Sequence, residues 1–492
     1  IYGEATATNN GYGIVIHDYG TITTLTNSGT IHGFSPYGAG GGGIYLSDAA
    51  TYIGTLTNTG TITGTSGSGQ DYGRGMVLYS DVGSIDNTGV ISGYSGKDFG
   101  YGLILDSTST ITTLTNSGSI IGSAAHNSGA GILLSESSTI STLTNTGTIS
   151  GLIGSEAPVR SQNAVGVWVF EKSSIETLNN SGTIQGILDP SVEDADGGFG
   201  ILIEKYSSIS TITNNGLIIG THNGQSDNYV YNLTGISVRD NSFIGSVINT
   251  GTIAGYTNNH TDAEGAIGLD VLRSSSIGTL TNSGLITGTA YESSVQGLRI
   301  INTSSINTIT NTGTISAAAI GTITDTGDEA TGLWVLNSST LSTLNNSGLI
   351  SGIATGVTAL GLAVQNTSTI ETLSNVGTIQ GYAKTEGIGI WMYGDSTIGT
   401  LNNSGTISGS ADTSAFGIVF ERATGNGNHI TTLINSGVIS GIAEVSKGYG
   451  IRTGMDETTS NTTIGTLTNI GEISGSTFDI FNDEDVITTF NN

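Results

Sequence analysis

Apolar and polar residues follow one pattern that recurs along the whole chain. An Asn-x-Gly phrase appears in fifteen copies between Asn27 and Asn469, at intervals of 28 to 35 residues. Five residues before each of these Asn residues stands Ile, Leu or Val, and four residues after it stands Ile. Columns that persist through so many copies are typical of repeat proteins, in which each copy forms one structural element.

Each repeat contains three short stretches with the period-two alternation of β-strands, as in residues 132–134, 142–144 and 148–150. We expect Leu143 and Ile149 to point inward, together with the two outer residues of the first stretch. The spacing of three between Ile140 and Leu143 marks a corner. The Asn-x-Gly phrase marks another corner, at which we expect Gly to take a positive φ and Asn to hydrogen-bond backbone locally.

Three strands and three corners in about 30 residues make one turn, or rung, of a solenoid. Like strands would stack in parallel about 4.8 Å apart, wound right-handedly as parallel connections generally are. The sequence therefore predicts an all-β fold, a right-handed parallel β-helix with three faces and about 15 rungs, as a single domain over residues 1–492. The Asn column is expected to form a stacked amide ladder. Longer loops between rungs are expected at residues 152–165, 187–199, 221–234, 256–267 and 319–331.

The outward positions of the second strand form a Thr-x-Thr column, which is the first candidate binding surface. Its candidate residues include Thr113, Thr115, Thr142 and Thr144. Thr favours strands, so this column is consistent with solubility and β-propensity alone. It is also consistent with a surface that recognises the same face of another molecule. Ice binding is the least favoured interpretation, because Asp86, Ile248 and Asn402 interrupt the array.

The middle position of the first strand is predicted to face outward and is apolar in seven consecutive repeats, from Val15 to Leu202. The column also contains Tyr45 and all three Trp residues, Trp168, Trp334 and Trp391. An exposed apolar strip usually marks an interface; the alternative is that loops or another part of the protein cover it. Opposite charges one rung apart are expected to form surface ion pairs. These pairs are Asp270 with Arg299 and Glu204 with Arg239.

Composition narrows the function. The net charge is -27, and only 12 Lys and Arg residues occur in 492, which disfavours nucleic acid as a partner. Acidic residues concentrate in the longer loops, where Asp194 and Asp196 are candidate binding residues; the alternative is a solvated loop. No calcium-binding or other metal-ligand spacing is present, so no metal or cofactor is expected. Strand-borne carboxylates are isolated and no nucleophile motif occurs, so we expect no enzymatic activity.

The repeated phrase, exemplified by "STISTLTNTGTISG" at 138–151, and the absence of Cys carry a resemblance. The chain resembles passenger domains of Gram-negative autotransporters, especially AIDA-type self-associating adhesins. Residues 487–492 match the start of a sixteenth repeat, so we expect the protein to continue. The resemblance implies a signal peptide and a translocator barrel outside these residues, with the outer membrane contacted only through that barrel.

The resemblance further implies secretion across the outer membrane and display on the bacterial cell surface. The implied roles are self-association, aggregation, biofilm formation, host adhesion and virulence. The partner would be the protein itself on another cell, or a host surface protein or glycan. Two alternatives stay open: a glycan- or host-protein-binding module that uses the Trp residues or the acidic loops, and a passive stalk that presents another domain.

Overall fold

The computed structural model describes residues 1–5, 9–37, 40–67, 72–154, 162–189, 195–222, 232–258, 265–291, 293–321, 329–421, 427–454, 462–483 and 485–492. They form two compact units, Ile1–Ala263 (unit 1) and Glu264–Asn492 (unit 2). Every regular element in the described ranges is a strand, and none of them supplies a helix that could cross a membrane.

Unit 1 is built from three parallel sheets, in which every third strand of the chain joins the same sheet. Sheet A contains β1 (Tyr2–Glu4), β4 (Thr30–Ser35), β7 (Thr61–Ser66), β10 (Val90–Ser95), β13 (Ser119–Ala124), β16 (Thr148–Ile153), β19 (Thr183–Leu188), β22 (Leu217–His222) and β25 (Thr252–Thr257). Sheet B contains β2 (Gly11–Ile16), β5 (Gly40–Leu46), β8 (Tyr72–Leu78), β11 (Phe99–Leu105), β14 (Gly129–Leu134), β17 (Asn163–Val169), β20 (Gly197–Ile203) and β23 (Leu233–Val238). Sheet C contains β3 (Thr21–Asn27), β6 (Tyr52–Asn58), β9 (Asp81–Asn87), β12 (Thr110–Asn116), β15 (Thr139–Asn145), β18 (Ser174–Asn180), β21 (Ser208–Asn214) and β24 (Phe243–Asn249).

Unit 2 repeats the arrangement. Its sheet A contains β28 (Leu285–Tyr291), β31 (Thr314–Ile320), β34 (Leu349–Ala354), β37 (Thr378–Ala383), β40 (Thr406–Ala411), β43 (Val438–Ala443) and β46 (Glu472–Gly475). Its sheet B contains β26 (Ala266–Leu272), β29 (Val295–Ile301), β32 (Glu329–Leu336), β35 (Thr358–Gln365), β38 (Glu386–Tyr393), β41 (Ser414–Glu421), β44 (Lys447–Arg452) and β47 (Phe478–Phe481). Its sheet C contains β27 (Ser276–Asn282), β30 (Ser305–Asn311), β33 (Thr340–Asn346), β36 (Thr369–Asn375), β39 (Thr397–Asn403), β42 (His429–Asn435), β45 (Thr463–Asn469) and β48 (Val486–Asn491).

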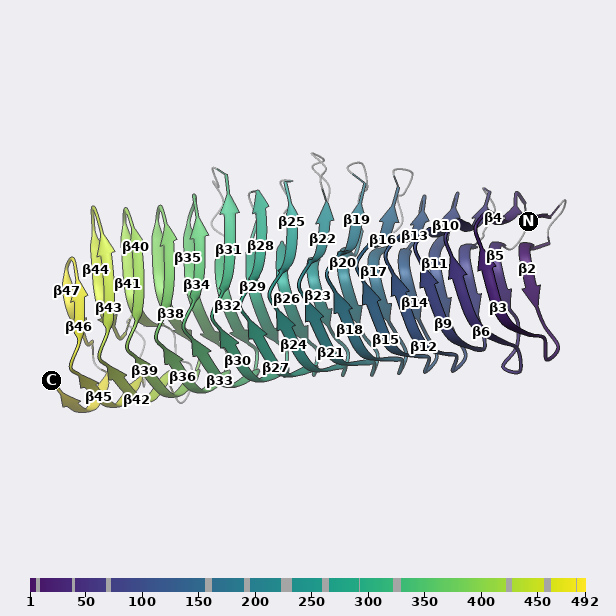
Figure 1. Cartoon of the computed structure of the whole chain (residues 1–492). Coiled ribbons are helices and arrows are strands. Elements are labelled where there is room, and N and C mark those ends of the chain that lie inside the picture. The colour runs from purple at the N-terminus through teal and green to yellow at the C-terminus, as the bar shows by residue number, and fades with distance from the viewer. Residues whose placement is uncertain are drawn as a thin grey trace. The chain divides into compact units, whose positions relative to one another are not determined.

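One rung passes through sheets B, C and A in that order, and equal strands of successive rungs lie side by side (Figure 1). Within the described residues, β2–β25 are 24 strands, or eight rungs, and β26–β46 are 21 strands, or seven rungs. The prediction of an all-β, three-faced parallel β-solenoid is confirmed. The predicted inward residues are buried as expected: Ile140, Leu143 and Ile149 are all fully buried.

The sheet A strand is longer than the sequence pattern predicts. β16 continues past Gly151 to Ile153, which is buried, and β17 begins at Asn163. Strands therefore occupy both ends of the predicted loop range 152–165, and residues 155–161 lie outside the described part of the chain.

Glycine columns let sheets A and B touch through their backbones. A Cβ atom on Gly122 of β13 would lie 1.8 Å from the carbonyl oxygen of Ala130 in β14, and one on Gly100 would lie 1.8 Å from the carbonyl of Ser123. No side chain fits at such distances, which explains why the fourth residue of the sheet A strand is Gly in almost every repeat. The exception, Ala317, pairs in register with Gly288.

The Asn ladder is confirmed. The Asn116 Nδ2 atom donates to Asn145 Oδ1 at 2.8 Å and to the carbonyl of Thr148 at 3.1 Å on the next rung, and to its own Gly118 carbonyl at 3.4 Å. The same three bonds recur at Asn87. Each buried amide is thus fully hydrogen-bonded, and it adds a donor to corner carbonyls such as that of Gly118, which also accepts from the Thr148 N–H at 2.9 Å.

The expected positive φ at the Gly of Asn-x-Gly is wrong. Among the described residues the left-handed region is occupied instead at the corner between sheets B and C, by consecutive pairs such as Glu136 (φ 51°) and Ser137 (φ 65°). The Gly of Asn-x-Gly is required for a different reason. A Cβ atom on Gly147 would lie 2.1 Å from the carbonyl oxygen of Gly118 on the preceding rung.

A second polar ladder, which the sequence analysis missed, lies behind the paired left-handed residues. Ser138 and Ser173 are almost fully buried, and the Ser138 N–H donates to Ser173 Oγ at 3.2 Å. The Ser304 and Ser339 pair repeats this bond at 3.3 Å in unit 2. Backbone bonds also join the corner loops, as from Ser137 N–H to the Glu171 carbonyl at 2.9 Å. Each corner is therefore held by its neighbours on adjacent rungs.

Candidate binding faces

The outer face of sheet C carries a continuous column of hydroxyl groups. Thr113 pairs in register with Thr142 and Thr115 with Thr144, and all four side chains are half-buried. The column through Thr113 is Thr or Ser on every described sheet C strand. In unit 1 it comprises Thr24, Thr55, Ser84, Thr113, Thr142, Thr177, Thr211 and Ser246. In unit 2 it comprises Thr279, Thr308, Thr343, Thr372, Thr400, Thr432, Thr466 and Thr489.

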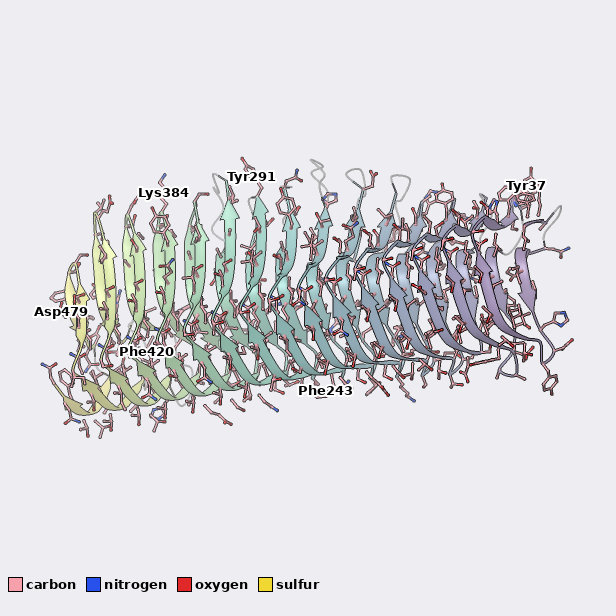
Figure 2. All side chains as sticks on the ribbon, viewed as in Figure 1. Tyr37, Phe243, Tyr291, Lys384, Phe420 and Asp479 are labelled. Atoms are coloured by element: carbon pink, nitrogen blue, oxygen red, sulfur yellow. The ribbon has the colours of Figure 1, made fainter. Side chains whose placement is uncertain are left out.

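The interruptions named from the sequence all fall in the neighbouring column, which contains Asp86, Ile248 and Asn402. On β24, Ile248 is 39% exposed and lies on the same strand as Phe243, which is 45% exposed. Figure 2 shows Phe243 at the outer side of the sheet. The sheet C strands contain no Lys or Arg. The described strands of sheet C are therefore rich in outward hydroxyl groups and contain neither Lys nor Arg, with one His, His429, at the start of β42.

The outward column of sheet B is mostly covered by its own neighbours. Val77, Ile104 and Leu202 are almost fully buried, although Val15 is 44% exposed. Tyr101 and Ile104 are three residues apart, yet they pack in one outer cluster. The strand bends at Gly102, which is skipped in the pairing between Tyr101 and Leu103 and their partners on β14. The bend brings the outward columns that contain Tyr101 and Ile104 together. The predicted exposed strip therefore forms a second hydrophobic cluster, on the outer side of sheet B.

In unit 1 this outer cluster is formed by Tyr101, Ile104, Ala130, Val165, Phe199 and Leu202, with Phe99, Leu133 and Trp168 packed against it. In unit 2 the equivalent cluster is formed by Leu360, Ala363, Ile388, Phe416, Val419 and Tyr449, with Trp334, Trp391 and Phe481 packed against it. The strip is thus largely buried by side chains of its own sheet, which neither of the two explanations left open from the sequence had included.

Tyr45 lies at an aromatic group on the same face of unit 1. Its ring stacks on Tyr12 with 4.6 Å between centroids and meets Tyr79 edge-on at 5.7 Å. The stack fits between strands because the residue in register with Tyr12 is Gly42; a Cβ atom there would lie 2.7 Å from the Tyr12 ring.

Two of the three Trp residues are held by a carboxylate on the next rung. Trp168 Nε1 donates to Glu204 Oε1 at 3.0 Å, and Trp391 Nε1 donates to Glu421 Oε2 at 3.1 Å. The same position on the rung after Trp334 is occupied by Gln365, and the buried donors Trp334 Nε1 and Gln365 Nε2 have no acceptor. All three indoles are half-buried and pack against the outer clusters, so part of each ring faces outward.

The two predicted ion pairs form, but they are not on the surface. Arg299 binds Asp270 through two hydrogen bonds of 3.0 and 2.9 Å, and the two side chains are 6% and 3% exposed. Arg239 Nε donates to Glu204 at 2.5 Å. Their burial follows from the strand bend, because both pairs lie on the covered outer face of sheet B.

Two carboxyls on the unit 2 face have shifted pKa values. Burial raises the pKa of Glu329 to about 7, against a hydrogen bond from Thr331 that lowers it and charges on Glu386 and Glu421 that raise it. Burial, reinforced by the Glu421 charge and opposed by Arg452, raises the pKa of Glu386 to about 7. Each carboxyl therefore holds its proton below about pH 7.

Sequence reasoning missed Glu329, Glu386 and Gln365 because they stand at strand ends that it assigned to loops or left unaligned. The sequence did contain a signal for the position of Gln365. Glu204 and Glu421 each stand two residues after the middle position of the first strand, in the repeat that follows one with a Trp at that position. Asp194 lies outside the described residues, and Asp196 is half-buried just before β20. No group of three or more acidic or His side chains in the described ranges could hold a metal ion.

Comparison of the chain with family models, with curated proteins and with solved structures found no match in any of the three.

Proposed function

We propose that this chain is the adhesive part of a protein displayed on the bacterial cell surface, and that it associates with copies of itself through the outer faces of sheet C. The supporting observation is the hydroxyl column, which is Thr or Ser on every described strand of the sheet. The resemblance of the repeats to self-associating autotransporter passengers supports the bacterial surface as its location.

Self-association suits this face for a chemical reason. A hydroxyl group both donates and accepts hydrogen bonds, so two identical hydroxyl columns are complementary to each other. The two copies also share one strand spacing, about 4.8 Å, which allows many rungs to match at once. Like charges are sparse on this face: the described sheet C strands contain no Lys or Arg, and their only carboxylates are those of Asp81, Asp86, Glu176 and Glu371. A two-fold symmetric contact between equal faces satisfies these conditions.

The test is to display the chain on cells that do not otherwise aggregate and to measure their settling. Thr142→Lys with Thr177→Lys places two charges on the sheet C face, and we expect settling to be lost. The matched control, Thr148→Lys with Thr183→Lys, adds the same charges on the same rungs at half-buried positions of sheet A. Settling that persists in the sheet C variant, or that is lost equally in both, contradicts the proposal.

A further inference from the structure

A different face, the outer face of sheet B in unit 2, presents two indoles in line. Trp334, Ala363 and Trp391 occupy the same register position on β32, β35 and β38. Ala363 is fully buried, and both indoles pack against the cluster that contains it. The two rings are therefore two strand spacings apart, about 9.6 Å, with only a methyl group between them.

Polar groups around these rings lack the partners they need. Trp334 Nε1 and Gln365 Nε2 are buried donors without an acceptor, and the Gln365 side chain is 6% exposed. Gln365 lies two residues beyond Ala363 and pairs in register with Tyr393. Buried donors in native proteins are almost always satisfied, so this position calls for an oxygen acceptor from outside the described residues.

The charge around the rings selects the chemistry of such an acceptor. Glu329 and Glu386 are the first residues of β32 and β38, in register with Thr358 between them. Glu421 adds a third carboxyl, and Arg452 adds a positive charge over the Phe481 ring that packs against the same cluster. The surroundings therefore have no excess of positive charge that would favour an anionic ligand. Protonated carboxyls, an amide and an indole N–H together donate and accept hydrogen bonds with neutral hydroxyl groups.

We propose that this face binds a neutral, extended β-1,4-linked oligosaccharide that runs along the stacking direction of the strands, with sugar rings stacked on Trp334 and Trp391. A pair of β-1,4-linked pyranose rings is close in length to two strand spacings, so alternate sugars meet successive indoles. Fixed aromatic rings favour such binding because they lose little freedom on contact. The inference does not depend on self-association, which uses sheet C.

The experiment is calorimetric titration of the whole chain with cellohexaose, with maltohexaose as the coiled α-linked comparison. We expect binding of cellohexaose only, and Trp334→Ala or Trp391→Ala to weaken it about ten-fold or more. The matched control is Trp168→Ala, because Trp168 occupies the same column and is held by Glu204, but its register neighbours are Leu133 and Leu202. This variant should bind as the unmodified chain does.

Because removal of an indole could disturb the strands, Trp334→Phe provides a variant that keeps an apolar ring, and circular dichroism checks that the β-structure is retained. Weaker binding by a folded Trp334→Phe protein supports the site. Absence of binding by the unmodified chain at millimolar cellohexaose overturns it. Equal loss in the Trp168→Ala protein, or full binding by folded variants of Trp334 and Trp391, also overturns it.

Discussion

Replacement of one member of the Asn ladder should destabilise its rung far more than replacement of the outward residue beside it. Asn116 is fully buried and takes part in four hydrogen bonds. Its amide donates to Asn145, Thr148 and Gly118, and its carbonyl oxygen accepts from Asn87. Asn116→Ala removes all four of these hydrogen bonds.

The expected cost follows from the groups left behind. Each buried polar group that loses its partner costs about 1–3 kcal/mol. The Gly118 carbonyl keeps its bond from the Thr148 N–H, so the facing amide groups of Asn87 and Asn145 carry most of the effect. We therefore expect Asn116→Ala to lower the free energy of unfolding by about 2–6 kcal/mol. Because each rung contacts only its neighbours, the loss should be greatest in adjacent rungs.

The measurement is urea denaturation combined with hydrogen exchange followed by mass spectrometry of peptides from β12 and β15. Thr115→Ala is the matched control, since Thr115 is the adjacent, half-buried residue that faces outward; it should change stability by about 0.5 kcal/mol or less. Exchange in the Asn116→Ala protein should accelerate first in these two strands. Equal effects of the two substitutions would refute the reasoning that the buried amide groups of the ladder depend on one another for hydrogen bonds.

Two further predictions concern unit 2 and the contact between sheets A and B. Because burial raises the pKa values of Glu329 and Glu386 from 4.5 to about 7, the folded state binds more protons than the unfolded state between these values. The contribution of these two carboxyls to the free energy of unfolding is therefore fully present below about pH 4.5. It is lost as the pH rises to about 7, by at most about 3 kcal/mol for each carboxyl. Urea denaturation at pH 5 and pH 8 should show this fall, and Glu329→Gln with Glu386→Gln should flatten it; a pH-independent midpoint in the unmodified chain would count against the assignment. Gly122→Ala places a Cβ atom 1.8 Å from a carbonyl oxygen and should cost about 3 kcal/mol or more. Gly29→Ala, where nothing lies within 4 Å, should leave the melting temperature nearly unchanged, and similar melting of the two variants would contradict the steric explanation.

Inward and outward positions were predictable because strand periodicity depends only on the order of residues along one chain. Ile140, Leu143 and Ile149 follow directly from that periodicity, and so does the Asn ladder, since equal residues in equal rungs must stack. The burial of Ile104 was not predictable in this way. It depends on a bend at Gly102 that brings Tyr101 to the same side. A Gly two residues after another Gly does not by itself predict a bend.

The conformations of the corners were the least predictable part. At the corner between sheets B and C, residues such as Lys172 and Glu171 take positive φ values although neither is Gly or Asn. Stacking bonds between rungs, as from Lys172 N–H to the Lys205 carbonyl at 3.0 Å, offset the local strain. Trp334 and Trp391 were candidates from the sequence, but Gln365 escaped prediction for a related reason, since it matters only through its place one rung beyond Trp334.

The register of equal residues has a consequence for how such a gene can change in length. Asn116 and Asn145 are 29 residues apart and occupy the same place on successive rungs. Loss of residues 117–145 would join Asn116 to Thr146, which restores the Asn-x-Gly corner and every inward column. Loss of a single residue within a strand would instead turn its apolar side chains to the opposite side. Duplications and deletions are therefore tolerated in whole repeats, and the number of rungs can vary among descendants without any change in how neighbouring rungs pack.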